Sequence, residues 1–273
     1  MPRVISSTNN LKRIRHNLMR IYYRLHYYPT KYLEDTDRPL IESLSIPNII
    51  HQSWVTKKLG RKHAHLIDAI RARNESYSFR IYDDGGADQY MSENCHNNDL
   101  YEIYQSLPMG PARIDIFRYW IIFDQGGWWL DIKSEIKVPI NQLAPPDSTS
   151  YIFHENNDLF ILPDERIYKS LKHPNKAIAN YCFGFRARHP FLKLLTESIV
   201  THYNEGFKFN NFKSRVLAHT GPGLFTKTVH KYIYHNYNTE KLYLDDIDGD
   251  GRIEYLSPNA GCRYVARKSY SIT

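Results

Sequence analysis

Apolar and polar residues alternate along the chain with two different spacings. Short apolar runs predict buried strands that end near Trp54, at 78–82 and at 128–132. Apolar residues three and four positions apart predict helices over 61–73 and 111–124, the second with a proline in its first turn. This succession favours an α/β domain with a mostly parallel central sheet flanked by helices. Ligands of such sheets bind at the C-terminal ends of the strands.

The remainder of this domain shows weaker patterns. Residues 141–180 are rich in Pro, Asn and Asp and predict loops, whereas residues 190–204 predict an amphipathic helix. The Asp-Asp-Gly-Gly run at 83–86 predicts a turn after the second strand, and short strands and turns are expected from residue 241 onwards. We therefore expect residues 46–273 to fold as a single domain.

The first 45 residues predict an N-terminal arm followed by a linker. Over residues 11–28, apolar side chains recur at steps of three and four with Arg and Lys between them, which predicts a basic amphipathic helix. Such a helix either docks its apolar face on the domain or lies on an anionic membrane, which would make the protein a peripheral membrane protein. Residues 29–45 are mixed and polar, as is typical of a linker.

The net charge of the chain is concentrated in this arm. Among 273 residues, 36 Lys and Arg stand against 29 Asp and Glu, which gives a net charge of +7. Residues 1–31 hold seven Lys and Arg and no acid, so the rest of the chain is electrically balanced. A basic groove is therefore not expected, and nucleic acid is not among the expected partners.

Membrane-spanning and targeting signals are not apparent in the sequence. No apolar run reaches the roughly 18 residues that a membrane-spanning helix needs, and no apolar core follows the basic N-terminus as in a signal peptide. The three cysteines, Cys95, Cys182 and Cys262, are odd in number and lack metal-binding spacing. These features favour a reducing, cytoplasmic location.

The most informative segment runs from Ala112 to Lys133. Asp115 and Arg118 lie three residues apart, so that a helix presents them on one face. A Gly-Gly pair then turns the chain back, and Asp131 follows at the end of the next strand. An acid, a cation and a second acid can thus converge on one polar ligand.

This set of side chains suits a nucleotide-sugar. Carboxylates accept hydrogen bonds from sugar hydroxyls, and the diphosphate needs positive charge from a metal or from basic side chains. The base needs an aromatic face, and Trp54 at a strand end is placed to offer one.

The segment also resembles a known family. Its pattern Asp-x-x-Arg-Tyr, followed by Gly-Gly-aromatic-x-x-Asp, is similar to the sugar-binding region with the DXD motif in glycosyltransferase family 32 and its relatives. These include yeast Golgi α-mannosyltransferases, animal α-1,4-galactosyl- and N-acetylglucosaminyltransferases and, more distantly, the clostridial glucosylating toxins. Further similar segments lie at 46–54, 180–184 and 219–223. The resemblance runs from residue 46 to about residue 230 and implies a GT-A fold.

The resemblance implies roles for individual residues. Asp115 and Asp131 would contact sugar hydroxyls or a metal, Arg118 the sugar or the phosphates, and Trp54 the base, while Asn180 would lie near the reacting centre. The residues expected at the donor are His51, Gln52, Trp54, Asp115, Arg118, Lys133 and Gly221. Those expected in catalysis are Asp131, Asp115, Arg118 and Asn180, and those expected at the metal are Asp131 and His219.

One position departs from the family pattern. The second acid of the motif, which usually holds a divalent metal, is Lys133 here. Three alternatives follow: Asp131 binds Mn²⁺ or Mg²⁺ with help from Glu135 or His219; the Lys133 ammonium replaces the metal and neutralises phosphate; or the site is inactive. Some bacterial-type relatives share this Asp-x-Lys-Ser variant, which disfavours an inactive site.

We therefore expect a glycosyltransferase that moves a sugar from a nucleoside diphosphate sugar to a glycan or another hydroxyl acceptor. The resemblance implies retention of anomeric configuration and favours a UDP-sugar, with GDP-mannose as the other donor. Two alternatives stay open: a nucleotide- or sugar-binding protein without turnover, and an adaptor that binds a membrane or a partner through the basic arm.

A last motif lies near the C-terminus. Asp246, Asp248, Asp250 and Gly251 match the start of a calcium loop, but position twelve is Ser257 instead of a bidentate carboxylate. An acidic turn is the stronger expectation for this segment.

Overall fold

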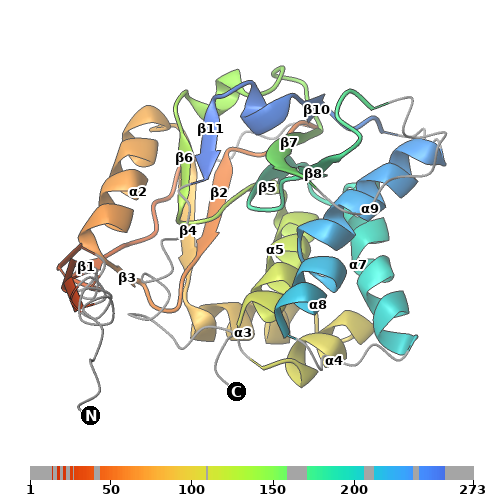
Figure 1. Cartoon of the computed structure of the whole chain (residues 1–273), viewed down its shortest axis with the longest axis horizontal. Coiled ribbons are helices and arrows are strands. Elements are labelled where there is room, and N and C mark those ends of the chain that lie inside the picture. The colour runs from red at the N-terminus through yellow and green to blue at the C-terminus, as the bar shows by residue number, and fades with distance from the viewer. Residues whose placement is uncertain are drawn as a thin grey trace, which may run out of the picture.

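The computed structural model describes most of the chain. It covers residues 28–39, 44–108, 110–158, 171–205, 212–235 and 240–255 and, within the N-terminal arm, Ile14, Asn17, Leu18, Ile21, Tyr22, Leu25 and His26. For residues 212–215 the backbone alone is described. This part of the chain folds around one central sheet with helices on both faces (Figure 1).

The central sheet has seven strands: β2 (Ile49–Ser53), β4 (Ser78–Tyr82), β5 (Gly127–Leu130), β7 (Ser150–Asp158), β8 (Lys176–Ile178), β9 (Cys182–Phe185) and β10 (Leu244–Asp245). Their order is β10-β7-β9-β5-β2-β4, and β8 pairs with β7 outside this row. β4, β2 and β5 are parallel, β9 runs antiparallel between β5 and β7, and β10 is parallel to β7. Because only β8 and β9 run in the opposite direction, the expected mostly parallel sheet is confirmed.

Helices cover both faces of the sheet (Figure 1). One face carries α2 (Arg61–Arg73), and the other carries α5 (Pro111–Gln125) together with α3 (Asp84–Asn94), α4 (Asp99–Ser106), α7 (Pro190–Asn204), α8 (Phe212–His219) and α9 (Pro222–Tyr234). Two apolar clusters fill the two layers. Trp128 and Trp129 of β5 join different clusters, because successive side chains of a strand point to opposite faces.

Two short ribbons complete the fold. β1 (Lys31–Tyr32) pairs antiparallel with β3 (Lys58–Leu59), and β6 (Ser134–Ile136) pairs antiparallel with β11 (Ile253–Tyr255). Single turns of 3-10 helix form η1 (Ile140–Gln142) and η2 (Ile247–Gly249). Since β6 begins shortly after Asp131, the β6–β11 ribbon borders the strand end that carries this acid.

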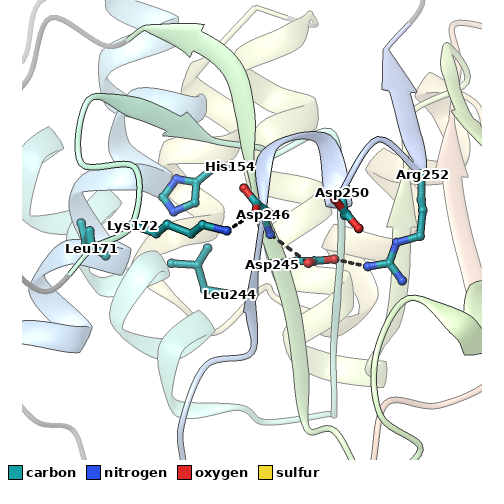
Figure 2. Close-up of a pocket in the computed structure, with 8 residues that line it drawn as sticks. All are labelled: His154, Leu171, Lys172, Leu244, Asp245, Asp246, Asp250 and Arg252. Carbon is teal, nitrogen blue, oxygen red and sulfur yellow. Dashed lines mark hydrogen bonds and ion pairs between the residues drawn. The ribbon is translucent and has the colours of Figure 1, made fainter.

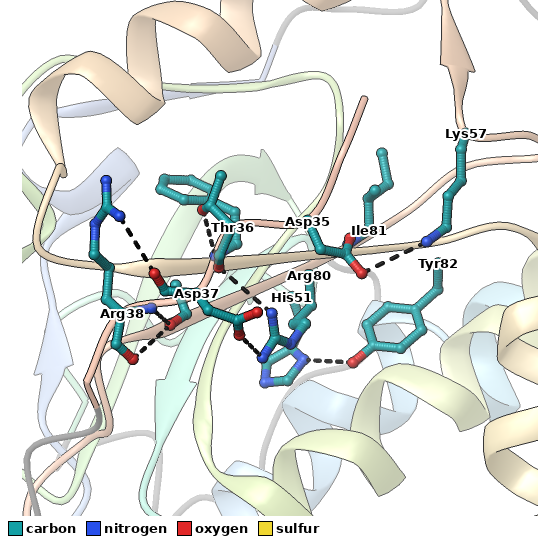
Figure 3. A network of polar contacts seen from close by, with 11 residues as sticks. Asp35, Thr36, Asp37, Arg38, His51, Lys57, Arg80, Ile81 and Tyr82 are labelled. Carbon is teal, nitrogen blue, oxygen red and sulfur yellow. Dashed lines mark hydrogen bonds and ion pairs between the residues drawn. The ribbon is translucent and has the colours of Figure 1, made fainter. Parts of the chain in front are cut away.

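Residues 30–39, which composition indicates as part of a linker, lie along the edge of the sheet. Leu33 is 2% exposed and belongs to the apolar cluster shared by β2 and α2. Thr36 forms an antiparallel bridge with Phe79 of β4, and its carbonyl accepts a hydrogen bond from the Arg80 guanidinium (Figure 3). This stretch is therefore anchored to the sheet, whereas the expected domain boundary stays a prediction.

The elements predicted around the candidate site are confirmed. α2, α7 and β4 have the expected ranges, and α5 ends one residue later than expected, at Gln125. Two glycines follow α5, and both have positive φ, 70° at Gly126 and 99° at Gly127. A Cβ at either position would lie 2.6 Å from a backbone atom, of Ala187 and of Ile49 respectively. Only glycine fits this turn, which places β5 directly beside β2.

Two local expectations are wrong. The run at 83–86 begins α3 instead of forming a turn, because the Asp83 carboxylate caps the helix and accepts a hydrogen bond from the Gly86 N–H at 2.8 Å. β7 crosses the stretch expected to be loops, and its segment Tyr151–Phe153 is buried between β9 and β10. In both places long-range packing and capping outweigh the local composition.

The N-terminal arm presents apolar side chains to solvent. Its described residues from Ile14 to His26 are helical. Four apolar side chains on this helix are exposed: Ile14 56%, Leu18 62%, Ile21 56% and Leu25 71%. Tyr22 of the same helix contacts α2: its hydroxyl accepts a hydrogen bond from Lys62, and the Lys62 ammonium lies 4.9 Å from the centroid of its ring. The described part of the arm thus touches the domain through Tyr22 while these four apolar side chains stay exposed, and the rest of the predicted helix lies outside the described residues. Within the described part, no helix combines the length and the apolar character needed to cross a membrane.

Candidate active site

Arg118 lies between two carboxylates near the C-terminal end of β5. α5 carries Asp115 and Arg118 one helical turn apart, and Asp131 follows the last residue of β5. Arg118 Nη2 lies 3.4 Å from Asp115 Oδ1 and 3.2 Å from Asp131 Oδ1. The guanidinium also lies over the Trp129 ring, 5.1 Å from its centroid. The structure thus brings together the acid, the cation and the second acid that the spacing predicts.

Asn180 and Thr220 complete this cluster. The Asn180 carbonyl accepts a hydrogen bond from Arg118 Nη1 at 2.6 Å, and the Asn180 side-chain amide donates to the Tyr119 hydroxyl at 2.9 Å and to Asp115 Oδ1 at 3.4 Å. The Thr220 hydroxyl donates to Asp115 Oδ2 at 3.1 Å, and the Tyr119 hydroxyl donates to the Thr220 carbonyl at 2.8 Å. Both oxygens of Asp115 are therefore held by neighbouring side chains.

Burial and mutual attraction set the charges of the cluster. Asp115 and Arg118 are 5% and 7% exposed. Burial raises the pKa of Asp115 to about 6, against the opposing effect of the Arg118 charge. Burial also lowers the pKa of Arg118, but the charges of Asp131 and Asp115 outweigh this effect and the net shift is upward. At neutral pH the cluster therefore consists of one cation held between two carboxylates.

Trp54 and Lys133 lie close to each other after the ends of β2 and β5. Trp54 follows β2 and Lys133 lies two residues after Asp131. The Lys133 ammonium is 5.8 Å from the centroid of the Trp54 ring, and the ring packs edge-on against His63 at 5.0 Å. Both side chains are half-buried. A half-buried aromatic ring is suited to stack on a base, and a cation beside it is suited to neutralise a phosphate attached to that base.

His51 and Gln52, also expected at the donor, make contacts within the sheet. The His51 ring nitrogens lie 3.3 Å from the Tyr82 hydroxyl (Figure 3) and 3.2 Å from the Gly126 carbonyl oxygen. Burial lowers the pKa of His51 to about 3, so the ring is neutral. Gln52 is 1% exposed and its amide donates to the Leu130 carbonyl at 3.4 Å. The expected contacts of both residues with a donor stay predictions.

Gly221 and His219 lie at the junction of α8 and α9. The Gly221 N–H donates to the Val216 carbonyl at 2.7 Å, and a Cβ at Gly221 would lie 3.0 Å from that same oxygen. This tight turn positions Thr220, which reaches Asp115. The His219 ring packs against His202, with centroids 5.8 Å apart. The expected role of His219 as a metal ligand stays a prediction.

Asp131 is the candidate ligand for a divalent metal. Its Oδ1 accepts a hydrogen bond from Trp129 Nε1 at 2.8 Å and faces Arg118, and its side chain is 23% exposed. Over the residues that the structure describes, no three or more His, Cys, Asp or Glu side chains are grouped to hold a metal ion. Mg²⁺ in nucleotide sites is commonly bound by one or two carboxylates and by substrate phosphates. The arrangement fits a metal that binds together with the donor.

Three residues of the cluster were not singled out as site residues by the sequence. Trp129 lies two positions before Asp131, so the alternation of side chains along a strand places both on the same face. This spacing alone predicts their contact. Tyr119 and Thr220 lie inside the segments that resemble the family, at 112–133 and 219–223. However, Thr220 is 105 residues from Asp115, and no local spacing links the two.

Comparison with known proteins agrees with this geometry. Residues 60–150 match the model of a family described as the glycosyltransferase sugar-binding region containing the DXD motif. Among solved structures, the PaToxG glycosyltransferase matches with a TM-score of 0.50 and 16% sequence identity, over 84% of this chain and 79% of that chain. These matches show a GT-A-like fold that contains a sugar-binding region of this kind.

The chain resembles yeast mannosyltransferases in sequence. It is 24% identical over 162 residues to inositol phosphoceramide mannosyltransferase 1 of Schizosaccharomyces pombe. The matched region covers 58% of this chain and 44% of that protein. It is 22% identical over 214 residues to the initiation-specific alpha-1,6-mannosyltransferase of Candida albicans, which covers 71% of this chain and 55% of that protein. The chain thus spans about half the length of these curated relatives.

Proposed function

We propose that this protein is a glycosyltransferase that moves a sugar from a nucleoside diphosphate sugar to a hydroxyl of a glycan or related acceptor. The observation that carries the proposal is the cluster of Asp115, Arg118 and Asp131, followed two residues later by Lys133, whose ammonium lies near the Trp54 ring. A UDP-sugar is the favoured donor. GDP-mannose is the second donor, supported by the resemblance to yeast mannosyltransferases.

In this proposal the two parts of the site bind two parts of the donor. Trp54 stacks on the base and Lys133 faces the diphosphate. The Asp131 side chain is 23% exposed against 8% for Asp115, so Asp131 is the acid that meets the sugar or a metal. Arg118 holds Asp131 in place from the side of the helix, and Asp115 pairs with the same guanidinium.

The charges of the site favour a divalent metal, Mn²⁺ or Mg²⁺. Asp115, Arg118, Asp131 and Lys133 together carry no net charge at neutral pH, whereas the diphosphate of a nucleotide-sugar carries two negative charges. A divalent cation held by Asp131 and by phosphate oxygens restores neutrality and supplies charge stabilisation for the departing diphosphate. Lys133 then adds to this stabilisation from the side of the base.

Retention of anomeric configuration is the proposed stereochemical outcome. Both oxygens of Asp115 already accept hydrogen bonds, from Asn180 and Thr220, which makes this carboxylate a poor nucleophile. We therefore assign catalysis mainly to the positioning of donor and acceptor and to charge stabilisation on the leaving group. The departing phosphate accepts the proton of the attacking hydroxyl.

The proposal is tested by nucleotide release from a panel of UDP- and GDP-sugars, with Mn²⁺ or with EDTA. We expect release from at least one donor, loss of at least about 100-fold in Asp131→Ala, and near wild-type rates in the control Asp68→Ala on α2. Turnover of no donor, or full turnover in Asp131→Ala, would contradict the proposal.

A nucleotide-binding protein without turnover is the second candidate function. The observation that favours it is Lys133, which stands where the family pattern has an acid. Calorimetry with UDP and GDP distinguishes the two candidates. Binding of either nucleotide without any release from the donor panel would select the second one.

We also propose that the basic arm binds an anionic membrane surface. The support is the exposed apolar face of Ile14, Leu18, Ile21 and Leu25 together with seven bases and no acid in residues 1–31. The full chain should cosediment with phosphatidylcholine vesicles that contain phosphatidylserine, and much less with phosphatidylcholine alone.

A single substitution tests this membrane contact. Leu25→Glu should abolish cosedimentation, whereas Leu44→Glu, at an exposed leucine outside the arm, should not change it. Equal cosedimentation of both variants would contradict a role of the apolar face.

A further inference from the structure

A polar cavity of about 640 Å³ lies beside the C-terminal ends of β7 and β10. Figure 2 shows the ring of His154 on β7, the side chain of Lys172 and the acidic segment 245–250 around it. Leu171 and Leu244 add apolar surface to its lining. These residues differ from those of the candidate active site, so the cavity is separate from that site.

The cavity lies at the same edge of the sheet as Asp131. β5 and β7 both run antiparallel to β9, which lies between them, so their C-terminal ends point the same way. Tyr181 connects the two ends: its carbonyl accepts a hydrogen bond from the Asp131 N–H at 2.8 Å, and its ring packs on Phe153 of β7. Two to three strand spacings, about 10 to 15 Å, therefore separate Asp131 from the cavity.

His154 is a buried side chain whose polar atoms lack partners. It is 1% exposed, it lines the cavity, and neither ring nitrogen has a hydrogen-bond partner among the described residues. Burial lowers the pKa of His154 to about 4, so at neutral pH one nitrogen is a donor and the other an acceptor. Leaving both unpaired disfavours the folded state. A ligand hydroxyl, which donates and accepts, suits such a ring.

Both cations in the lining of the cavity are paired with carboxylates of the protein (Figure 2). Arg252 Nη2 lies 2.5 Å from Asp245 Oδ2, and the Lys172 ammonium forms an ion pair with Asp246. Asp250 adds another carboxylate, so the lining carries no excess of positive charge. A phosphorylated ligand would meet repulsion here, whereas sugar hydroxyls can donate to the carboxylates.

We propose that this cavity binds the distal sugar residues of an uncharged acceptor oligosaccharide. The inference rests on the proposed transferase function, because it places the reacting hydroxyl of the same acceptor at the Asp131 site. The separation of the two sites requires an acceptor longer than one sugar ring. The apolar surface of Leu171 and Leu244 packs on the C–H face of a sugar.

The test measures binding of neutral sugars to the full chain by saturation-transfer NMR. The probes are maltotriose, cellotriose and α-1,6-mannotriose, each compared with the methyl glycoside of its monosaccharide and with mannose 6-phosphate. Asp250→Asn is the test variant, because Asp250 has a left-handed backbone with φ 58° that Asn tolerates. Asp68→Asn on α2 is the matched control at another partly exposed aspartate.

We expect at least one trisaccharide to bind more tightly than its monosaccharide, and Asp250→Asn to weaken that binding about tenfold. Asp68→Asn should bind as the wild type does. Binding of no trisaccharide, equal binding by Asp250→Asn, or a preference for mannose 6-phosphate would overturn the inference. UDP titration and donor hydrolysis with the wild type are run in parallel, so that failure of the donor function is seen separately.

Discussion

Arg118 on α5 and Asp131 after β5 lie 3.2 Å apart, and this contact ties the buried helix to the end of the strand. The same guanidinium faces Asp115 at 3.4 Å and donates to the Asn180 carbonyl at 2.6 Å. One largely buried side chain thus contacts two carboxylates and one backbone carbonyl. The geometry offered to a donor depends on this single buried cation.

Replacement of this cation by lysine should damage both stability and donor binding. The Arg118 guanidinium uses Nη2 for the two carboxylates and Nη1 for the Asn180 carbonyl. The single ammonium of Lys lacks this planar geometry, and a poorly paired buried cluster is costly. For Arg118→Lys we expect a loss of about 3 kcal/mol in the free energy of unfolding and loss of nucleotide release beyond about 100-fold. Denaturant unfolding and the release assay measure the two effects.

The matched control for this prediction is Arg113→Lys, on the same helix. Arg113 pairs with Asp88 at 3.3 Å, and the Asp88 side chain is 41% exposed. Lysine can keep an ion pair with Asp88 but loses the stacking of the Arg113 guanidinium on Tyr104, 4.4 Å from its ring centroid. We therefore expect a loss of about 1 kcal/mol and unchanged nucleotide release. Equal losses in the two variants would show that the helix tolerates neither change and that the position of Arg118 is not special.

The raised pKa of Asp115 predicts a distinct pH dependence of stability. Its pKa is about 6 in the folded chain and 3.8 in the reference state, so the folded protein binds this proton more tightly. The destabilisation by ionised Asp115 is therefore absent below about pH 4, grows as the pH rises, and is complete above about pH 6.

Asp115→Asn removes this titration and gives the measurement. The free energy of unfolding of the wild type, minus that of Asp115→Asn, should rise as the pH falls from about 6 to about 4. Denaturant unfolding at a series of pH values provides both curves. A difference that is constant, or that falls over this range, would contradict the prediction.

How far the sequence predicts this site depends on the distance between its parts. The contact of Asp115 with Arg118 and the arrival of Asp131 after a Gly-Gly turn are local features, and both are confirmed. The hydrogen bond from Thr220 to Asp115 depends instead on the α8–α9 turn. Helical and strand periods act over a few residues, so they carry no information on that contact.

The same limit applies to the fold. α2 and α5 follow directly from apolar periodicity, because each buries one or more faces against the sheet. β7 was missed because its flanks are rich in Pro, Asn and Asp, and its burial between β9 and β10 depends on strands 30 to 90 residues away. Likewise, Asp83 caps α3 where two glycines indicate a turn.

The position of Lys133 leads to a prediction about the binding of UDP and of Mn²⁺ at the site. Its ammonium lies near the Trp54 ring, where a base with its phosphates is proposed to bind. Lys133→Ala should weaken UDP binding about tenfold in the presence of Mn²⁺, because one unit of positive charge is lost. Lys133→Asp restores the second acid of the motif and should bind Mn²⁺ more tightly in the presence of UDP.

Isothermal titration with UDP and with Mn²⁺ measures both variants of Lys133. Lys137→Ala is the control, because Lys137 is 48% exposed and pairs with Glu254 on the β6–β11 ribbon. If Lys133→Ala binds UDP as tightly as the wild type does, the ammonium does not face the diphosphate.

The Tyr119 hydroxyl separates the positioning of the active site from general stability. It is fully buried, accepts from the Asn180 amide at 2.9 Å and donates to the Thr220 carbonyl at 2.8 Å. Tyr119→Phe leaves both groups without this partner, which should lower the free energy of unfolding by about 1–3 kcal/mol. Asn180 and Thr220 both hold Asp115, so nucleotide release should fall about tenfold as well.

Tyr232→Phe is the control for this prediction, because it also removes a buried tyrosine hydroxyl, but one outside the Asp115 cluster. The Tyr232 hydroxyl donates to the Glu240 carbonyl at 2.9 Å, and the side chain is 3% exposed, but it packs near α7 instead of the cluster. It should therefore lose a similar amount of stability and keep wild-type turnover. If Tyr119→Phe loses turnover and Tyr232→Phe does not, the hydrogen-bond network behind Asp115 positions the active site. Equal turnover in both variants would reduce Tyr119 to a packing residue.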